Sequence, residues 1–296
     1  MTIVGAQSIR DGATLTAMEE SSDRLTATAH WDAVHRTSAS SGRLRAVART
    51  VLGEEAFDFF VQGGYVGYTF RELLRPLVRP GQRILEVGSA PGLALAKLAR
   101  ALELDPWGLD YSEAGVVANR ATFTSFGFDP GHVLLADFFG DAIVADHGAG
   151  FDLVMSHGFI EHFRDVRPVV ARHVALTRPG GLVAISIPNY AGLNAALKRF
   201  FHPDLLAAHN LDIMSRDRFA ELFDDQGLAP IFCGYLGAFQ FGLLTTPPTS
   251  PKRHLLAATR WLQIPLDLAQ RRLFGANSPE LPGLSPYLYY VGRRLA

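Results

Sequence analysis

The sequence predicts an α/β protein built on a parallel sheet with helices on both faces. Three observations support this fold class. Short apolar runs alternate with segments of helical period from Arg83 to Asn189, the first run ends in the glycine-rich turn VGSAPG, and an acidic residue ends each of the next two runs. Runs this continuously apolar indicate strands buried on both faces, and with helices between them a parallel sheet is the economical arrangement.

Composition narrows the class of protein. The 296 residues can bury a full core, and the one cysteine, Cys233, has no internal partner, which favours a reducing compartment. With 28 basic and 29 acidic residues the net charge is −1, so the concentrated positive field that nucleic acids require is missing. We find neither a secretory signal nor an apolar stretch of about 18 residues that would span a bilayer, and we predict a cytoplasmic protein.

The first 78 residues divide into two parts. Residues 1–30 mix acidic residues with Ser, Thr and Ala, and we expect a mobile leader. Residues 31–78 are expected to form a helical cap, with helices in AVARTVLGEEAFDFF and TFRELLRPLV joined by the glycine-rich VQGGYVGY. Its aromatic residues either close a pocket or pack in the core, and both readings stay open: Trp31, Phe59, Phe60, Tyr65 and Tyr68.

The main domain is expected at residues 79–296, starting after the RPGQ turn. Its first five strands are predicted in RILEVGS, WGLDY, HVLLADF, FDLVMSHG and LVAISIPN. The helices between them are GLALAKLARALEL, SEAGVVANRATFTSFG and VRPVVARHVALTR, and a PGG turn precedes the fifth strand.

The end of the chain adds a helix and two strands. Ser215 is placed as an N-cap and Gly227 as a stop for the helix SRDRFAELFDDQG, and LAPIFCGYLG and SPYLYYVGRRL are predicted strands. Insertions at about 190–214 and 238–284 interrupt this pattern, the second with one predicted helix from Arg253 to Phe274. Long insertions usually carry recognition, and we expect them to build a lid.

The glycine-rich turn is the first candidate for ligand binding. In an open parallel sheet, ligands sit where a strand ends and its helix begins. Gly88, Ala90 and Gly92 allow close approach there, and Asp110 stands where an acid would accept hydrogen bonds from a ribose diol. Leu93 stands where the dinucleotide-binding fingerprint has its last glycine, so the turn fits a pyrophosphate poorly. A nucleoside is therefore a better candidate ligand than a dinucleotide.

A second acid, Asp137, ends the third strand beside two aromatic residues that can bound a purine ring, and Glu86 inside the first strand can orient the turn. These motifs, in this order, resemble class I S-adenosylmethionine-dependent methyltransferases from about Arg79 to Gly237 plus the last strand. The FDLVMSHGFIEHF segment is similar to the quinone-biosynthesis members of that family. The resemblance implies a Rossmann-like sheet of seven strands, the last antiparallel.

The resemblance also implies S-adenosyl-L-methionine as cofactor. Gly88, Ser89, Ala90 and Gly92 would contact its methionine part, Asp110 its ribose and Asp137 its adenine amine. The full set of cofactor residues that we predict is Glu86, Gly88, Ser89, Ala90, Gly92, Asp110, Tyr111, Asp137, Phe138 and Ser156.

In methyl transfer the protein mainly aligns the reactants, because the cofactor already supplies an activated methyl group. A hydroxyl acceptor needs a base, and an imidazole suits that task at neutral pH. His162, His157 and His209 are the predicted catalytic residues, each with a capping, structural or surface role as the alternative. Their spacing with Glu161 matches no compact ligand motif, so we predict no metal.

The predicted acceptor is a small molecule methylated at oxygen or nitrogen, such as a specialised metabolite or a glycan or lipid intermediate. Residues 226–251 carry no charge, which fits a buried strand and packed loop or, alternatively, a channel for a hydrophobic acceptor or a membrane-surface contact. The basic residues of 252–272 face water, an anionic group of the substrate or a second subunit. Rival functions are a cofactor-binding protein without methyl transfer, a nicotinamide-dependent oxidoreductase and a macromolecular methyltransferase.

Overall fold

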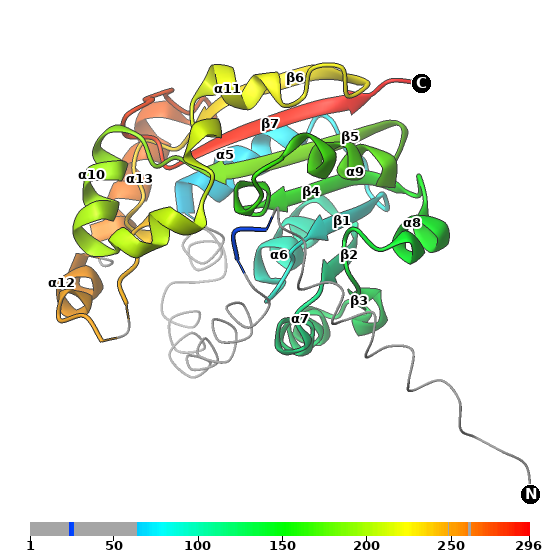
Figure 1. The fold of residues 1–296 in the computed structure, drawn as a ribbon, viewed down its shortest axis with the longest axis horizontal. Helices are drawn as coiled ribbons and strands as arrows, with labels where there is room; N and C mark the ends of the chain where they lie inside the picture. Colours follow the sequence, from blue (N-terminus) through cyan, green and yellow to red (C-terminus); the bar gives the residue numbers. More distant parts are fainter. Residues whose placement is uncertain (1–23, 27–63, 248, 260–261) are drawn as a thin grey trace, which may run out of the picture.

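The sheet of this protein has seven strands in the order β3-β2-β1-β4-β5-β7-β6 (Figure 1). A computed structural model describes residues 24–26 and 64–296 apart from 248 and 260–261. The expected leader is therefore described only at residues 24–26, and the expected cap only from residue 64. The strands are β1 Arg83–Val87, β2 Asp105–Asp110, β3 Val133–Leu135, β4 Phe151–His157, β5 Thr177–Pro188, β6 Leu228–Leu236 and β7 Tyr287–Arg294.

Strand directions confirm the expected topology. β1 pairs in parallel with β2 and β4, β2 with β3, and β4 with β5. β7, the last strand in the chain, inserts between β5 and β6 and runs antiparallel to both. The chain leaves β1 toward β2 on one side and returns to β4 on the other, so the carboxyl end of β1 is the switch point where such sheets bind ligands.

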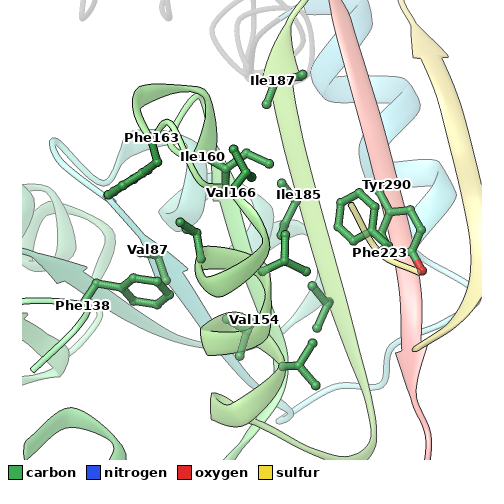
Figure 2. Close-up of a cluster of buried hydrophobic side chains, with 14 of the residues drawn as sticks. Val87, Phe138, Val154, Ile160, Phe163, Val166, Ile185, Ile187, Phe223 and Tyr290 are labelled. Atoms are coloured by element: carbon green, nitrogen blue, oxygen red, sulfur yellow. The ribbon is translucent and has the colours of Figure 1, made fainter. Parts of the chain in front are cut away.

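Helices cover both faces of the sheet, as the apolar strands require. One face carries α8 Asp141–His147, α9 Arg167–Leu176 and α11 Arg216–Glu221, and the other carries α5 Gly64–Leu74, α6 Leu93–Leu102 and α7 Glu113–Phe126. Side chains alternate between the faces with the period of a strand: Val154 packs on the first and Leu153 on the second. Figure 2 shows the first cluster, where the Phe223 and Tyr290 rings stack with centroids 3.5 Å apart.

Local capping explains where two of these helices begin and end. Ser112 accepts a hydrogen bond from the Gly115 amide at the start of α7, and Gly127 ends that helix with φ of 79°. Ser215 caps α11 as predicted, accepting from the Arg218 amide. The helix ends at Glu221, however, so its predicted extension to Gly227 is wrong.

The two insertions contribute short helices at one end of the molecule. They are α10 Gly192–Phe201, η3 Pro203–Ala208, η4 Leu211–Ile213, η5 Phe241–Leu243, α12 Lys252–Thr259 and α13 Gln263–Phe274. Phe201, Leu244 and Leu256 form a small core that joins the first insertion to the second. In Figure 1, α10, α12 and α13 gather beyond the end toward which β4 points. The insertions therefore stand over the ligand-binding edge of the sheet.

Three element predictions need correction. The predicted single helix from Arg253 to Phe274 is two helices, and Pro265 falls in the first turn of the second, where a missing amide hydrogen costs nothing. β5 begins at Thr177 and runs through the predicted PGG turn, with an irregular register against β4. The glycine-rich joint before α5 is partly helical, because α5 already begins at Gly64.

Two one-turn helices complete the described elements, η1 Pro130–His132 and η2 Ile160–His162. Among the helices of the described residues, none is both long and apolar enough to cross a bilayer.

Candidate active site

A cavity opens at the carboxyl ends of β1, β2 and β3, and residues of all three strand ends line it. Its volume is about 150 Å³. Its lining includes Gly88 and Ala90 from the glycine-rich turn, Asp110 and Tyr111 from the end of β2, and Asp137 and Phe138 from the segment after β3. These six belong to the predicted cofactor set. We call this space the first cavity.

The glycine-rich turn is held in a shape that excludes side chains. Gly88 and Gly92 have φ of 67° and 79°. A Cβ atom on Gly88 would lie 2.9 Å from the Phe159 ring, and one on Gly92 would lie 1.9 Å from Asn119 Oδ1. Gly92 therefore permits α6 to start against α7, while Gly88 leaves room for the Phe159 ring beside the first cavity.

Substitution of Gly92 tests this packing. We expect Gly92→Ala to lower the free energy of unfolding by about 2 to 5 kcal/mol, because positive φ and a clash with Asn119 add together. Urea unfolding monitored by circular dichroism measures it. Gly81→Ala is the matched control: Gly81 has the same φ of 79° but no atom within 4 Å of its Cβ position. Equal losses in the two variants would contradict the packing argument.

Asp110 is buried and braces the turn from the end of β2. Its Oδ2 accepts from the Ala90 amide at 3.1 Å and its Oδ1 from the Ser112 amide at 2.9 Å. Behind it, Glu86 is buried, and its Oε2 finds no hydrogen-bond partner among the described residues. Desolvation, and then the Asp110 carboxylate, raise the pKa of Glu86 to about 8. Glu86 is therefore mostly a neutral acid at pH 7.

Asp137 and its surroundings hold a residue that the sequence did not single out. Arg24 Nη2 lies 2.7 Å from Asp137 Oδ1, and the Arg24 guanidinium lies 5.3 Å from the Tyr111 ring centre and 5.6 Å from that of Phe139. The Leu25 amide donates to His162 O. Arg24 and Thr26 thus line the first cavity, and no sequence motif marks Arg24.

The remaining predicted cofactor residues lie behind the cavity wall. Ser89 Oγ accepts from Asn119 Nδ2 at 2.6 Å. Ser156 is buried under His173, whose Nε2 lies 3.1 Å from Ser156 Oγ. Ser89, Ser156, Glu86 and Gly92 therefore shape the cavity without being among its lining residues.

A larger cavity of about 620 Å³ adjoins the first one, and His157, Gly158 and His162 line both. We call it the second cavity. It is walled by α5, α6, the end of β5 and the two insertions. The two spaces therefore meet at the segment that follows β4.

The structure brings two of the predicted catalytic histidines together. The His162 and His209 rings lie 4.7 Å apart between centroids, although 47 positions separate them. His162 Nδ1 lies 2.9 Å from Ala208 O, and His209 Nδ1 lies 2.7 Å from Leu205 O. Since a carbonyl only accepts, each Nδ1 carries the hydrogen and each Nε2 carries the basic lone pair.

Glu161 completes this cluster. Its carboxylate and one nitrogen of each histidine lie within 4.8 Å of one another, and burial raises the pKa of Glu161 to about 8. Its Oε2 has no hydrogen-bond partner in the described part of the chain. One carboxylate and two imidazoles can hold a proton or a divalent cation. From the sequence, Glu161 and these histidines are considered as metal ligands, and no metal is predicted because their spacing matches no compact motif.

His157 is a weak base. It is packed between Phe70 and Tyr289, its Nδ1 lies 2.7 Å from Ser186 Oγ, and burial lowers its pKa to about 4. At neutral pH this imidazole is neutral and holds little affinity for a proton. Its place on both cavities suits a wall or a positioning group.

Comparison with known proteins identifies the family. The model of the methyltransferase-domain family matches residues 63–231, which is more than half of the chain. The chain belongs to this methyltransferase family. Its fold and motif order make it a class I S-adenosylmethionine-dependent methyltransferase.

Curated relatives of this methyltransferase match over part of their length. A ubiquinone biosynthesis O-methyltransferase of Rhizobium leguminosarum bv. trifolii is 30% identical over 134 residues, 45% of this chain and 50% of the relative. An uncharacterised methyltransferase of Mycobacterium tuberculosis is 34% identical over 104 residues, 35% of this chain and 49% of the relative. The chain thus matches about half the length of these relatives.

A solved structure supports the fold. It is a chain from the complex between the Haloferax volcanii Trm112 methyltransferase activator and a methyltransferase, with a TM-score of 0.50 and 17% identity. The match covers 85% of this methyltransferase and 96% of that chain. At this identity the likeness concerns the fold alone.

Proposed function

We propose that this methyltransferase transfers the methyl group of S-adenosylmethionine to an oxygen or nitrogen atom of a small molecule, with His162 as general base. The observation that carries the proposal is the meeting of the two cavities at His157, Gly158 and His162. A donor in the first cavity and an acceptor in the second would face each other across that segment. Alignment of this kind lowers a barrier by several kcal/mol.

The residues of the first cavity fit the cofactor. Gly88 lines the cavity without a side chain, which would allow close approach by the methionine part. Asp110 and Asp137 line the cavity and would accept from the ribose hydroxyls and the adenine amine respectively, with Tyr111 as a wall. When bound, the cofactor supplies an activated methyl group on a sulfonium centre, so the protein needs only to align and deprotonate the acceptor.

His162 is the better placed of the predicted bases. Its Nδ1 hydrogen is bound by Ala208 O, which fixes the tautomer, so that Nε2 carries the lone pair that would accept a proton from the acceptor hydroxyl. His209 stands beside it, so the proton can pass to the second imidazole of the cluster. An amine acceptor would use the same position with less help.

Transfer of labelled methyl tests the proposal. The purified protein is incubated with methyl-labelled S-adenosylmethionine and a cell extract separated into small-molecule, protein and nucleic-acid fractions. We expect label in the small-molecule fraction. Label confined to a macromolecular fraction, or no label despite binding of S-adenosylhomocysteine, would instead support the macromolecular or the non-transferring alternative.

Arg24 gives a prediction with an unexpected sign. Because its guanidinium pairs with Asp137 inside the first cavity, we expect Arg24→Ala to tighten S-adenosylhomocysteine binding about fivefold, the equivalent of one partly exposed ion pair. Calorimetric titration of wild type and variant measures the change. Weaker binding by the variant would mean that Arg24 holds the cofactor.

Chelation separates the two chemical readings of the Glu161, His162 and His209 cluster. We predict that dialysis against EDTA leaves the rate of methyl transfer unchanged, because a base with a fixed tautomer needs no ion. The rate is measured before and after dialysis, with Mg²⁺ or Zn²⁺ added back as a control. A loss that an added ion restores would contradict this prediction and assign the cluster to a metal.

A further inference from the structure

The second cavity combines an apolar wall with a buried positive charge. Aliphatic and aromatic residues form one part of its lining, among them Val66, Phe70, Leu98, Leu243, Tyr287 and Tyr289. Lys198 of α10 also lines it and is 0% exposed. A fully buried lysine in an apolar wall is costly and calls for an explanation.

The recorded partners of Lys198 are all neutral. Its Nζ donates to Leu243 O at 2.9 Å and to Thr245 Oγ1 at 3.2 Å, and it lies 4.8 Å above the centre of the Tyr190 ring. None of the ion pairs between described residues includes it. Buried charges are normally paired, so the ammonium group is short of an anion. Burial accordingly lowers the pKa of Lys198 to about 8.

The other polar groups near Lys198 can donate to an anion. Thr245 Oγ1 also lies 3.1 Å from His202 Nδ1, and both residues line the second cavity. Lys198, Thr245 and His202 thus form one cluster that joins α10 to the segment after η5. We call it the Lys198 cluster.

Other charges around the second cavity have the same sign. Arg71 and Lys97 line it as well. Arg71 Nε lies 3.1 Å from Glu72 Oε1, and Glu72 is not a lining residue. The one acid among the described lining residues is Glu161, and the pKa of Glu161, raised to about 8 by burial, leaves it mostly uncharged at pH 7. The cavity wall therefore attracts an anion and contributes little repulsion.

A series of ring contacts relates the Lys198 cluster to the base. Lys198 lies against Tyr190, the Tyr190 and His209 rings have centroids 5.2 Å apart, and His209 lies against His162. The cationic and the basic ends of the cavity are thus separated by the rings of Tyr190 and His209. A ligand that reached both ends would be polar at its two ends and apolar between them.

We infer that the methyl acceptor is a small amphipathic anion, a hydrophobic molecule whose carboxylate or phosphate group is bound by Lys198, Thr245 and His202. This inference rests on the proposed function, since it takes the second cavity as the acceptor site. The anionic end lies at the Lys198 cluster, and the atom that receives the methyl group lies toward His162.

Binding of matched probes tests the inference without knowledge of the acceptor. Hexanoate, hexyl phosphate and 1-hexanol share one alkyl chain and differ in the charge of the head group. Saturation-transfer NMR on the full chain at pH 7 should give an affinity for at least one anion about tenfold above that for hexanol, as expected for a charge-assisted hydrogen bond. Whichever anion is preferred assigns the group as carboxylate or phosphate.

Variants locate the effect. Lys198→Met should abolish the preference for the anion, and Lys198→Arg should retain it. Lys252→Met is the control and should keep the wild-type preference. Lys252 does not line the cavity, and its Nζ lies 4.0 Å from the centre of the Phe200 ring. Thermal unfolding verifies that each variant is folded. Equal affinity of wild type for hexanol and for both anions would overturn the inference, and this measurement does not depend on whether Lys198→Met folds. An unchanged preference for the anion in a folded Lys198→Met would also overturn it.

The proposed function is tested separately in the same samples. S-Adenosylhomocysteine should bind wild type and a folded Lys198→Met equally, because Lys198 does not line the first cavity. Binding of S-adenosylhomocysteine without any preference for an anion defeats the inference and leaves the proposed function standing. Absence of S-adenosylhomocysteine binding in wild type defeats the proposed function itself.

Discussion

Asp110→Ala is expected to weaken binding of S-adenosylhomocysteine by about 100-fold, the effect of losing two hydrogen bonds to a charged group. The carboxylate has two tasks in the first cavity. It would accept from the ribose hydroxyls, and it already accepts from the Ala90 amide, which holds the glycine-rich turn against β2. Alanine removes both, so binding suffers directly and through the turn. Isothermal calorimetry measures the loss.

A matched control separates binding from local folding. Asp110 Oδ1 accepts from the amide two residues ahead, and Asp129 Oδ1 makes the same kind of bond to the Gly131 amide at 2.7 Å, away from the first cavity. Asp129→Ala should bind S-adenosylhomocysteine as wild type does. Equal affinity in wild type and in a folded Asp110→Ala would remove the basis for placing the ribose at β2.

His162→Ala should leave cofactor affinity unchanged and reduce turnover of a hydroxyl acceptor by about 10²- to 10⁴-fold, the usual contribution of a general base. The reason is that His162 lines both cavities and that the contact of its Nδ1 with Ala208 O fixes the tautomer, so that Nε2 carries the basic lone pair. Single-turnover rates with saturating cofactor isolate this step from binding.

A control variant and the dependence of the methyl-transfer rate on pH test whether His162 acts as the base. His254→Ala replaces an exposed histidine of α12 and should have the wild-type rate. Loss of the base should also remove the fall in rate at acidic pH, whereas loss of a merely structural histidine would leave that fall in place. A full rate in His162→Ala, or a reduced rate with the pH profile unchanged, would refute the assignment.

Much of the fold could be predicted from the sequence because its signals are local. Strands buried on both faces are continuously apolar, as in β4 and β5, and they stand out from helices of period 3.6. The failures are also local. β5 includes the PGG sequence because Thr177 already pairs with Phe151 of β4, before the register shifts to the pair Leu153–Leu182, and Pro265 is compatible with a helix only where the helix begins.

The cofactor side of the candidate site could be predicted for the same reason. Gly88, Asp110 and Asp137 each follow a strand, and the carboxyl ends of parallel strands share one edge of the sheet. The acceptor side depends on contacts between distant segments. Nothing near His209 announces its contact with His162, and nothing near Arg24 announces its pairing with Asp137. Such partners are fixed by tertiary packing, which residue patterns do not encode locally.

A crystal structure with S-adenosylhomocysteine tests the central claim most directly. We predict density for the ligand in the first cavity, with the ribose hydroxyls at Asp110, the adenine amine at Asp137 and the sulfur atom facing the second cavity near His162. Density at another site, or a first cavity in which Arg24 still pairs with Asp137 and no ligand is present at saturating concentration, would contradict the account.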